Sequence, residues 1–288
     1  MNPKILIVGC GDIGYRVAKR ELPSKALVAL CRSSQSAEKA LHEGLEPIRG
    51  DLDGDLSLDQ LPKTLSGIYY FAPPPNRGVL DSRMTRFLKK LEGLQIAKFV
   101  YISTTGVYGD CEGRWIDESE PTLPLTDRGK RRLDAELQLQ RWSDTTKVGC
   151  SILRVPGIYG PGRLPIERIK NRVPVVRIEE APYSNRIHSE DLAEICYQAM
   201  NKREAVGIYN VSDGHPTSMT DYFLKVADCL GLERPPQISM EEARKRFTPE
   251  MLSFLDESKR ISNQKLLKDL KFTLKYPDLS EGLKHSIE

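Results

Sequence analysis

Short apolar segments alternate with amphipathic segments over the first half of the chain. The first apolar segment, Lys4–Val8, is rich in β-branched residues and is followed by glycines, which is typical of a buried strand. Residues 11–22 then place apolar side chains near helical spacing, which predicts an amphipathic helix. The pattern continues with predicted strands at Ala26–Cys31, Glu46–Gly50, Gly67–Ala72, Lys98–Ser103 and Cys150–Val155, and predicted helices at Ser36–His42, Leu80–Glu92 and Thr126–Ser143.

Strands that alternate with helices at this spacing predict βαβ units and a doubly wound, mostly parallel α/β sheet. After Arg163 the regular alternation gives way to short segments, several prolines and a charged stretch at Met240–Arg246. We therefore expect a core over residues 1–163. Residues 164–288 are expected to return elements to that core and to build a small lobe from residues 164–183 and 217–254. Leucines at helical spacing predict a packed C-terminal helix in residues 265–275.

The composition excludes several classes of protein. The 288 residues carry 43 Lys and Arg against 40 Asp and Glu, a balance that argues against a dedicated nucleic-acid binder. The longest apolar runs fall far short of the roughly 18 residues that span a bilayer, and no signal peptide fits before a strand that begins at Lys4. None of the six cysteines has C-x-x-C or metal-ligand spacing, so we expect reduced thiols, no metal and a cytoplasmic location.

A glycine-rich turn joins the first predicted strand to the first helix. Gly9, Gly11 and Gly14 form a G-x-G-x-x-G motif, in which the first glycine permits the turn, the second lets the backbone approach a pyrophosphate and the third allows close helix packing. Asp12 and Ile13 open the helix, whose N-terminus faces the anion. This context predicts a dinucleotide site, and a turn built for packing alone is the alternative.

The residue after the second strand bears on the choice of cofactor. NAD-binding folds usually place an acid about 20 residues after the glycines, to bind the ribose 2′-hydroxyl. Arg32 stands there instead, followed by Ser33, Ser34 and Gln35, and a guanidinium with hydroxyls suits a 2′-phosphate. We therefore expect NADP in preference to NAD, unless Arg32 is only a solvated surface charge.

Further motifs resemble the extended short-chain dehydrogenase/reductase superfamily, and within it the NAD(P)-dependent epimerase/dehydratase group. The resemblance covers nearly the whole chain and implies an NAD(P)-binding Rossmann fold with a small C-terminal substrate lobe. The matching segments are Gly50-Asp51-Leu52, Phe71–Pro75, Tyr101–Asp110, Trp115–Glu118, Leu153–Arg163, Asn185–Ala193, Tyr209-Asn210-Val211 and residues 258–277.

The resemblance also implies cofactor contacts beyond the glycine turn. Asp51, beside Leu52, stands where the family's Asp contacts adenine, and Ala72 and Pro73 begin the loop that runs beside the cofactor. The remaining positions expected to contact the cofactor are Pro156, Ile158 and Lys130.

The catalytic residues match the family only in part. Family members use a Ser/Thr to orient the substrate oxygen, a Tyr to move the proton, and a Lys to bind the ribose and lower the Tyr pKa. The resemblance places Thr104 at the first position and Lys130 at the third, but Thr126 stands where the Tyr belongs. An aliphatic alcohol is less acidic than a phenol and too short to span the same gap, and Thr126 also suits a helix N-cap.

Two explanations of Thr126 stay open. Another group, such as Tyr108, Tyr159, Tyr183 or His188, supplies the proton in an enzyme; alternatively, the protein is a catalytically silent NADP(H)-binding redox-sensing or regulatory module. The intact Thr104, Lys130 and substrate lobe favour the enzyme.

The expected substrate is a sugar-like or other small carbonyl or alcohol compound. The family's nucleotide-sugar enzymes carry an R-D-x-I-H segment, and in this chain the arginine is displaced by two positions to Arg186. Arg186 and Arg163 together suit an anion clamp, so Tyr108, Arg163 and Arg186 are the candidate substrate contacts and a phosphate-bearing substrate stays open. Family members often dimerise through the helices predicted at Leu80–Glu92 and Thr126–Ser143, so we expect a monomer or a homodimer.

Overall fold

The chain divides by its internal packing into two compact units, each built from several separate segments. The computed structural model describes residues 4–287. The first unit takes in residues up to Val107, Asp127–Arg154 and Leu192–Tyr209; the second comprises Tyr108–Thr126, Val155–Asp191 and residues from Asn210 onward. The expected boundary at residue 163 separates the residues predicted to bind the cofactor from the rest, and it stays a prediction. The two units defined by packing do not follow that boundary, because their segments alternate along the chain.

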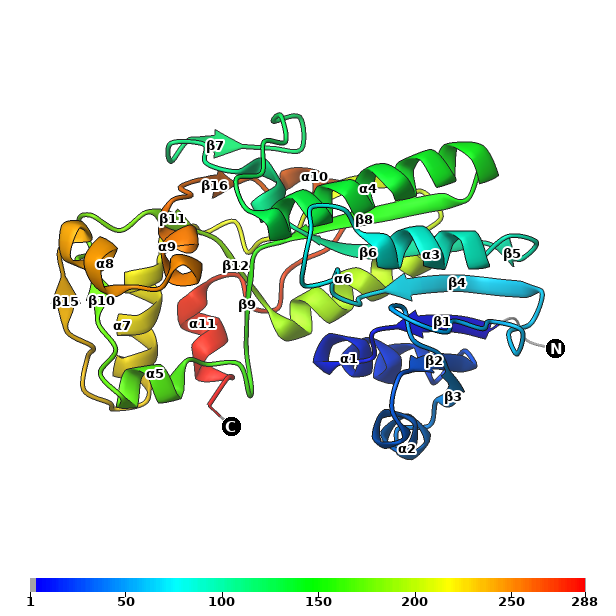
Figure 1. The fold of residues 1–288 in the computed structure, drawn as a ribbon. Helices are drawn as coiled ribbons and strands as arrows, with labels where there is room; N and C mark the ends of the chain where they lie inside the picture. The colour runs from blue at the N-terminus through cyan, green and yellow to red at the C-terminus, as the bar shows by residue number, and fades with distance from the viewer. Residues whose placement is uncertain (1–3, 288) are drawn as a thin grey trace. The chain divides into compact units, whose positions relative to one another are not determined.

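The first unit contains a mostly parallel α/β sheet (Figure 1). Its strand order is β3-β2-β1-β4-β6-β8-β13, with β5 beside β4. The order reverses between β1 and β4, which makes that place the topological switch point of a doubly wound fold. The predicted fold class is therefore confirmed. The elements of this unit and its margins are β1 (Lys4–Val8), α1 (Asp12–Glu21), β2 (Leu27–Cys31), α2 (Ser34–His42), β3 (Glu46–Arg49), β4 (Thr64–Tyr70), α3 (Ser82–Lys90), β5 (Gln95–Ile96), β6 (Lys98–Thr104), the 3-10 turn η1 (Thr105–Tyr108), α4 (Asp127–Thr146), β8 (Gly149–Val155), α6 (Ser189–Asn201) and β13 (Gly207–Asn210).

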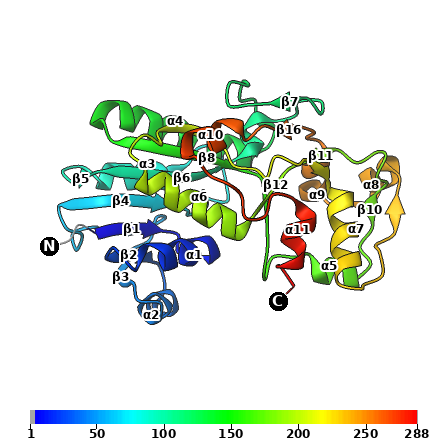
Figure 2. The same cartoon turned by 180° about the vertical axis from the view of Figure 1, so that it is seen from behind.

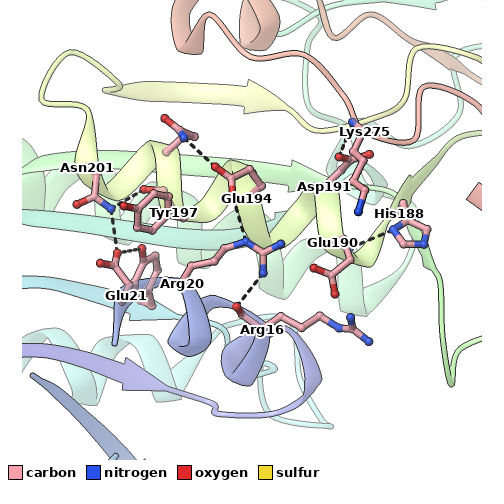
Figure 3. A network of polar contacts seen from close by, with 12 residues as sticks. Arg16, Arg20, Glu21, His188, Glu190, Asp191, Glu194, Tyr197, Asn201 and Lys275 are labelled. Atoms are coloured by element: carbon pink, nitrogen blue, oxygen red, sulfur yellow. Dashed lines mark hydrogen bonds and ion pairs between the residues drawn. The ribbon is translucent and has the colours of Figure 1, made fainter. Parts of the chain in front are cut away.

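Helices cover both faces of this sheet (Figures 1 and 2). On one face, α3 and α4 bury Phe87 and Leu139 in a cluster with Leu6, Ile68 and other strand residues. On the opposite face lie α1 and α6, linked to each other by polar contacts (Figure 3). Arg20 Nε donates to Glu194 Oε2 at 3.0 Å, which ties these two helices together.

A buried carboxylate adds to this second face. Glu21 of α1 is fully buried and accepts hydrogen bonds from the Tyr69 hydroxyl at 2.6 Å and from Asn201 Nδ2 at 3.0 Å. The helix α6 also explains a glycine inside β4, since a Cβ on Gly67 would lie 2.3 Å from Met200 Sδ. The helices α1 and α6 therefore pack close against the sheet.

The predicted core elements agree with the observed ones apart from their ends. The second helix begins at Ser34 rather than Ser36, because Ser33 caps it. The strand predicted at Gly67–Ala72 extends from Thr64 to Tyr70. The helix predicted in residues 265–275 ends at Leu270, because Lys271 adopts the left-handed conformation with φ of 47°, and one more helix follows it at Leu279–Lys284.

The second unit is built from two- and three-residue strands and short helices. Its apolar clusters gather around Tyr159 and Phe223, with a smaller one at Val176 and Ile238. Strand pairs are β9 with β12, β10 with β15, β11 with β14, and β7 with β16. The elements are β7 (Trp115–Ile116), β9 (Gly157–Tyr159), α5 (Ile166–Lys170), β10 (Val175–Val176), β11 (Tyr183–Ser184), β12 (Arg186–His188), β14 (Thr217–Ser218), α7 (Met219–Cys229), β15 (Gln237–Ile238), α8 (Met240–Arg246), α9 (Pro249–Leu255), β16 (Arg260–Ile261), α10 (Gln264–Leu270) and α11 (Leu279–Lys284).

Within residues 4–287, no helix combines the length and apolar character needed to cross a membrane. No group of three or more His, Cys, Asp or Glu side chains in that part is arranged to hold a metal ion. The six cysteines are free thiols, and only Cys229 is exposed.

Candidate functional site

The glycine turn lies between β1 and α1, where the sequence predicts it. Gly9 has φ of +87°, and a Cβ there would lie 2.4 Å from the backbone nitrogen of Ala72. A Cβ on Gly14 would lie 3.2 Å from the Gly9 carbonyl oxygen, so this glycine lets α1 approach the strand closely. The backbone therefore requires glycine at Gly9, and the tight contact at Gly14 favours it there.

Gly11 differs from these two packing glycines. A Cβ on Gly11 would meet no atom of the described chain within 4 Å, and its φ of −89° is open to any residue. Gly11 is also the N-cap residue of α1, and no side chain caps that helix. A free space beside an uncapped helix N-terminus fits the pyrophosphate of a dinucleotide, because backbone N–H groups there attract anions. Asp12 and Ile13 begin the same helix.

The other predicted cofactor residues of the first unit follow strand ends on the same edge of the sheet. Arg32 and Ser33 follow β2, and Asp51 and Leu52 come shortly after β3. The Asp51 carboxylate accepts the Asp53 N–H at 3.0 Å, which shapes this turn. The carboxyl ends of parallel strands are where open α/β sheets bind ligands.

The loop after β4 is held by three arginines that the sequence analysis did not single out. Arg132 Nη1 reaches the Ile102 carbonyl oxygen at 2.9 Å and the Ala72 carbonyl oxygen at 3.5 Å, while Arg83 Nη1 donates to the Pro73 carbonyl oxygen at 2.8 Å. Arg131 donates to the Gly78 carbonyl oxygen. These bonds fix the loop before any ligand binds. Arg131 and Arg132 belong to a basic cluster near the start of α4, whereas Arg83 lies in α3 and has no such sequence signal.

The two predicted catalytic residues, Thr104 and Lys130, lie in the first unit, and each has a polar group that is able to donate a hydrogen bond. Thr104 ends β6, and its Oγ1 accepts the Gly106 N–H at 3.2 Å, which leaves its O–H able to donate. Lys130 lies in the first turn of α4 with its side chain 46% exposed, and its Nζ is 3.5 Å from Asp127 Oδ1. Thr126 immediately precedes α4.

Next to these residues, a buried ion pair links α4 to β8. Arg154 Nη2 donates to Glu136 Oε2 at 2.7 Å, and the Ser103 hydroxyl donates to Glu136 Oε1 at 2.5 Å. Both charged side chains are almost fully buried. This network fixes the strand that ends at Thr104 against the helix that carries Lys130.

In the second unit, Tyr108 and Tyr159 are core residues. The Tyr108 hydroxyl donates to Asn210 Oδ1 at 2.8 Å, and the Tyr159 hydroxyl donates to the Asp278 carbonyl oxygen at 3.2 Å. Burial raises the pKa of Tyr159 well above its usual value, which disfavours release of its proton near neutral pH. Tyr183, by contrast, is 45% exposed.

His188 is packed rather than open. Its ring centre is 3.8 Å from that of Tyr276, and its Nδ1 accepts the Glu190 N–H at 3.2 Å (Figure 3). The neighbouring Asp191 accepts the backbone N–H groups of Lys275 and Tyr276. The Ile187-His188 motif therefore joins β12 and α6 to the C-terminal segment.

Arg186 is a buried cation of the second unit. Its side chain is 7% exposed, and its guanidinium carbon lies 3.8 Å from the centre of the Tyr222 ring. Within the described chain its Nε makes no hydrogen bond, and its Nη2 has only Ser184 Oγ at 3.4 Å and Met219 Sδ at 3.3 Å as partners. Burial lowers the pKa of Arg186. A buried guanidinium with so few partners is suited to receive an anion.

Three further residues of the second unit, Pro156, Ile158 and Arg163, are predicted to contact the cofactor or the substrate. These roles stay predictions. Ile158 of β9 pairs with Ile187 of β12, and Pro156 directly precedes β9. Arg163 donates its backbone N–H to the Gly160 carbonyl oxygen. No contact in the described residues joins Arg163 to Arg186, so the anion clamp that combines them stays a prediction.

Comparisons with known proteins agree with this geometry. Residues 5–212 match the model of the NAD dependent epimerase/dehydratase family. The protein YeeZ of Escherichia coli K12 is 25% identical over 96% of the chain and 97% of the relative, and a putative UDP-arabinose 4-epimerase of Arabidopsis thaliana is 24% identical over 96% and 73%.

Solved structures give the same picture of the fold. A conserved protein of unknown function from Silicibacter pomeroyi DSS superposes with a TM-score of 0.82 at 28% identity, covering 98% of this chain and 97% of that one. The UDP-glucuronic acid 4-epimerase of Bacillus cereus in complex with NAD superposes with a TM-score of 0.78 at 18% identity over the same shares.

Proposed function

The chain belongs to the NAD dependent epimerase/dehydratase family, and we propose that it is an NADP(H)-using epimerase, dehydratase or reductase of atypical type. A nicotinamide dinucleotide follows from the family, and the preference for NADP(H) is part of the proposal. The observation that carries it is the glycine turn, in which Gly9 is required and Gly14 favoured by packing whereas Gly11 borders free space. Such a turn fits the pyrophosphate of a dinucleotide.

The residues of the first unit have distinct roles in this proposal. The N-terminus of α1 binds the pyrophosphate, Asp51 and Leu52 bind near the adenine, and Ala72 and Pro73 line the cofactor. When bound, a nicotinamide ring supplies the hydride acceptor or donor for an alcohol or carbonyl substrate. Thr104 donates a hydrogen bond to the reacting oxygen, and Lys130 binds the nicotinamide ribose.

The proton that accompanies hydride transfer needs a donor other than Thr126. An aliphatic hydroxyl has a pKa far above that of a phenol, so Thr126 is a poor acid–base group. Tyr108 and Tyr159 are buried with engaged hydroxyls and His188 is packed against Tyr276. The exposed Tyr183 is the freest of the four candidates from the second unit.

The substrate proposed is a sugar-like or other small compound that carries a phosphate or another anion. The relatives and structural neighbours named as UDP-sugar epimerases support a sugar-like substrate. The buried guanidinium of Arg186 supports an anionic group, and Arg163 and Tyr108 stay further candidate contacts. We also place the protein in the cytoplasm.

Both a monomer and a homodimer remain open. A groove of about 850 Å³ runs along α3, α4 and β5 and is lined partly by Leu88, Leu91 and Trp142. This apolar lining supports pairing through the two helices.

The second candidate function is a silent NADP(H)-binding module, which Thr126 favours. One experiment separates the two. NADPH and NADH are titrated against the protein by nicotinamide fluorescence, and sugar nucleotides and small carbonyl compounds are then screened for oxidation or reduction of the bound cofactor. Turnover that is lost in Lys130→Ala supports the enzyme, and cofactor binding with no turnover supports the module. If neither nucleotide binds, both functions are excluded.

A further inference from the structure

Two arginines stand beside each other at the ends of neighbouring strands. In the parallel pairing of β2 with β3, Cys31 is the partner of Arg49, and Arg32 is the next residue along. Both arginines are exposed, and neither forms an ion pair within residues 4–287. Two cations without an ion pair at the ends of adjacent strands make this edge of the sheet locally positive.

The acidic residue within electrostatic range of Arg32 is already engaged. Asp53 accepts a bond from Arg83 Nε at 2.7 Å and a second one from Arg83 Nη2. These bonds to Arg83 are the largest cause that lowers the pKa of Asp53, and the charge of Arg32 contributes after them. The Asp53 carboxylate thus has its direct bonds with Arg83 and, within the described chain, forms none with Arg32 or Arg49.

The hydroxyls beside the arginines differ in what they can still bind. The Ser33 Oγ accepts the Ser36 N–H at 3.1 Å and also bonds the Ser36 hydroxyl, as the cap of α2. The Ser34 Oγ accepts Arg49 Nη1 at 3.4 Å, so its own O–H remains able to donate. Ser34 therefore suits an anion better than Ser33.

We infer that Arg49 and Ser34 complete, with Arg32, a site for a phosphate monoester, the 2′-phosphate of NADP(H). This inference rests on the proposed function, because it needs a dinucleotide whose ribose lies at the carboxyl end of β2. Two guanidinium groups and one hydroxyl match a dianion with three acceptor oxygens. The neutral 2′-hydroxyl of NAD(H) presents no such charge, so Arg49 determines specificity.

The test compares ligands with and without the 2′-phosphate. Dissociation constants are measured for NADPH, NADH, 2′,5′-ADP and 5′-AMP with wild type, Arg32→Met, Arg49→Met and Ser34→Ala. Arg203→Met, which removes an exposed arginine after α6, is the matched control. In Arg49→Met we expect NADPH and 2′,5′-ADP to bind about 10-fold more weakly, the usual effect of one charge-assisted contact. NADH and 5′-AMP should change by less than about 2-fold, since charge-independent contacts persist.

Every other outcome overturns the inference, and the pattern of affinities shows whether the proposed function, the NADP preference or only the role of Arg49 is wrong. If wild type binds neither NADPH nor NADH, the proposed function fails with it. If wild type binds both equally and no arginine variant matters, the NADP preference fails. If NADPH is preferred and Arg32→Met weakens it while Arg49→Met does not, only the role of Arg49 fails. Equal weakening of NADPH and NADH in Arg49→Met would show a structural role.

Discussion

The guanidinium of Arg186 stacks on the ring of Tyr222 at 3.8 Å, and within residues 4–287 it has no carboxylate within ion-pair distance. A cation–π contact offsets only part of the cost of burying a charge. Gly157, its partner on β9, leaves room for it, since a Cβ there would lie 2.6 Å from Arg186 Nη1. The fold therefore accommodates a buried cation that has no direct ion pair in the described part of the chain, with Asp213 and Asp221 in electrostatic range.

Replacing this charge tests whether it is kept for a ligand. We expect Arg186→Met to keep the free energy of unfolding or to raise it by about 1 kcal/mol, because an apolar chain of similar length removes an unpaired buried charge. Urea denaturation measures the change. A loss above about 2 kcal/mol would assign Arg186 a mainly structural role through Tyr222.

Gly11→Ala should separate cofactor binding from folding. The added methyl meets no atom of the described chain, so we expect a change in stability below about 1 kcal/mol, whereas NADPH binding should fall at least about 10-fold because the methyl fills the space for the pyrophosphate. Gly9→Ala is the contrast, because its methyl would clash with the Ala72 backbone and destabilise the fold. Thermal unfolding and fluorescence titration give the two readouts. Normal NADPH affinity in Gly11→Ala would contradict the assigned site.

The buried pair of Glu136 and Arg154 should be costly to break on one side. Glu136→Ala leaves Arg154 buried without its carboxylate, and we expect a loss of about 3–5 kcal/mol in chemical denaturation. The double variant Glu136→Ala/Arg154→Met should recover a large part of that loss, because no unpaired charge remains. Equal stability of the single and double variants would show that the lost packing of Glu136 dominates.

The carboxyl of Asp213 should make stability depend on pH. Burial is the largest cause that raises its pKa to about 7, against the favourable charges of His215 and Arg186 and together with the like charge of Asp278. The folded state then holds a proton between about pH 4 and pH 7 that the unfolded chain has released, so this group's contribution to stability is lost as the pH rises through that range.

Because an asparagine cannot ionise, the Asp213→Asn variant should lack the part of the pH dependence of stability that the Asp213 carboxyl causes. The stability of Asp213→Asn relative to wild type should increase from pH 4 to pH 7, by at most about 4 kcal/mol. Denaturant titrations across this range measure both proteins. Parallel pH profiles would show that Asp213 titrates normally.

Lys130 and Thr126 should differ sharply in their effect on turnover. Lys130→Ala is expected to lower kcat/KM at least about 10-fold, since it removes the cation that binds the ribose. Thr126→Ala should stay within about 2-fold, because its hydroxyl is too weak an acid. A Thr126→Ala loss as large as that of Lys130→Ala would make Thr126 part of the machinery.

The core strands and the glycine turn could be predicted because their signals are local. Apolar runs and glycine spacing lie within a few residues, as at Lys4–Val8 and Gly9–Gly14. The short strands of the second unit, such as β7 and β16, pair residues about 145 positions apart, and two-residue segments carry no periodic signal.

The surroundings of the proposed anion-binding residues were also hard to predict, because they too depend on contacts between segments that are distant in the sequence. Arg49 enters the anion site only through its register with Cys31, which no sequence pattern encodes. The contact of Ser33 with the phosphate stays a prediction; that its hydroxyl caps α2 was not predicted, because local capping of this kind depends on where the helix begins. The burial of Arg186 against Tyr222 likewise depends on a helix 36 residues further along the chain.

The interleaving of the two units limits how this protein can be divided or recombined. The chain passes from one unit to the other after residues 107, 126, 154, 191 and 209, the fourth time inside the helix α6. A cut at any of these points separates the segments of at least one unit, and no continuous fragment contains one unit alone. A new specificity therefore has to be introduced by point substitutions and loop exchanges within the full chain, because neither unit can be expressed or grafted as one continuous fragment.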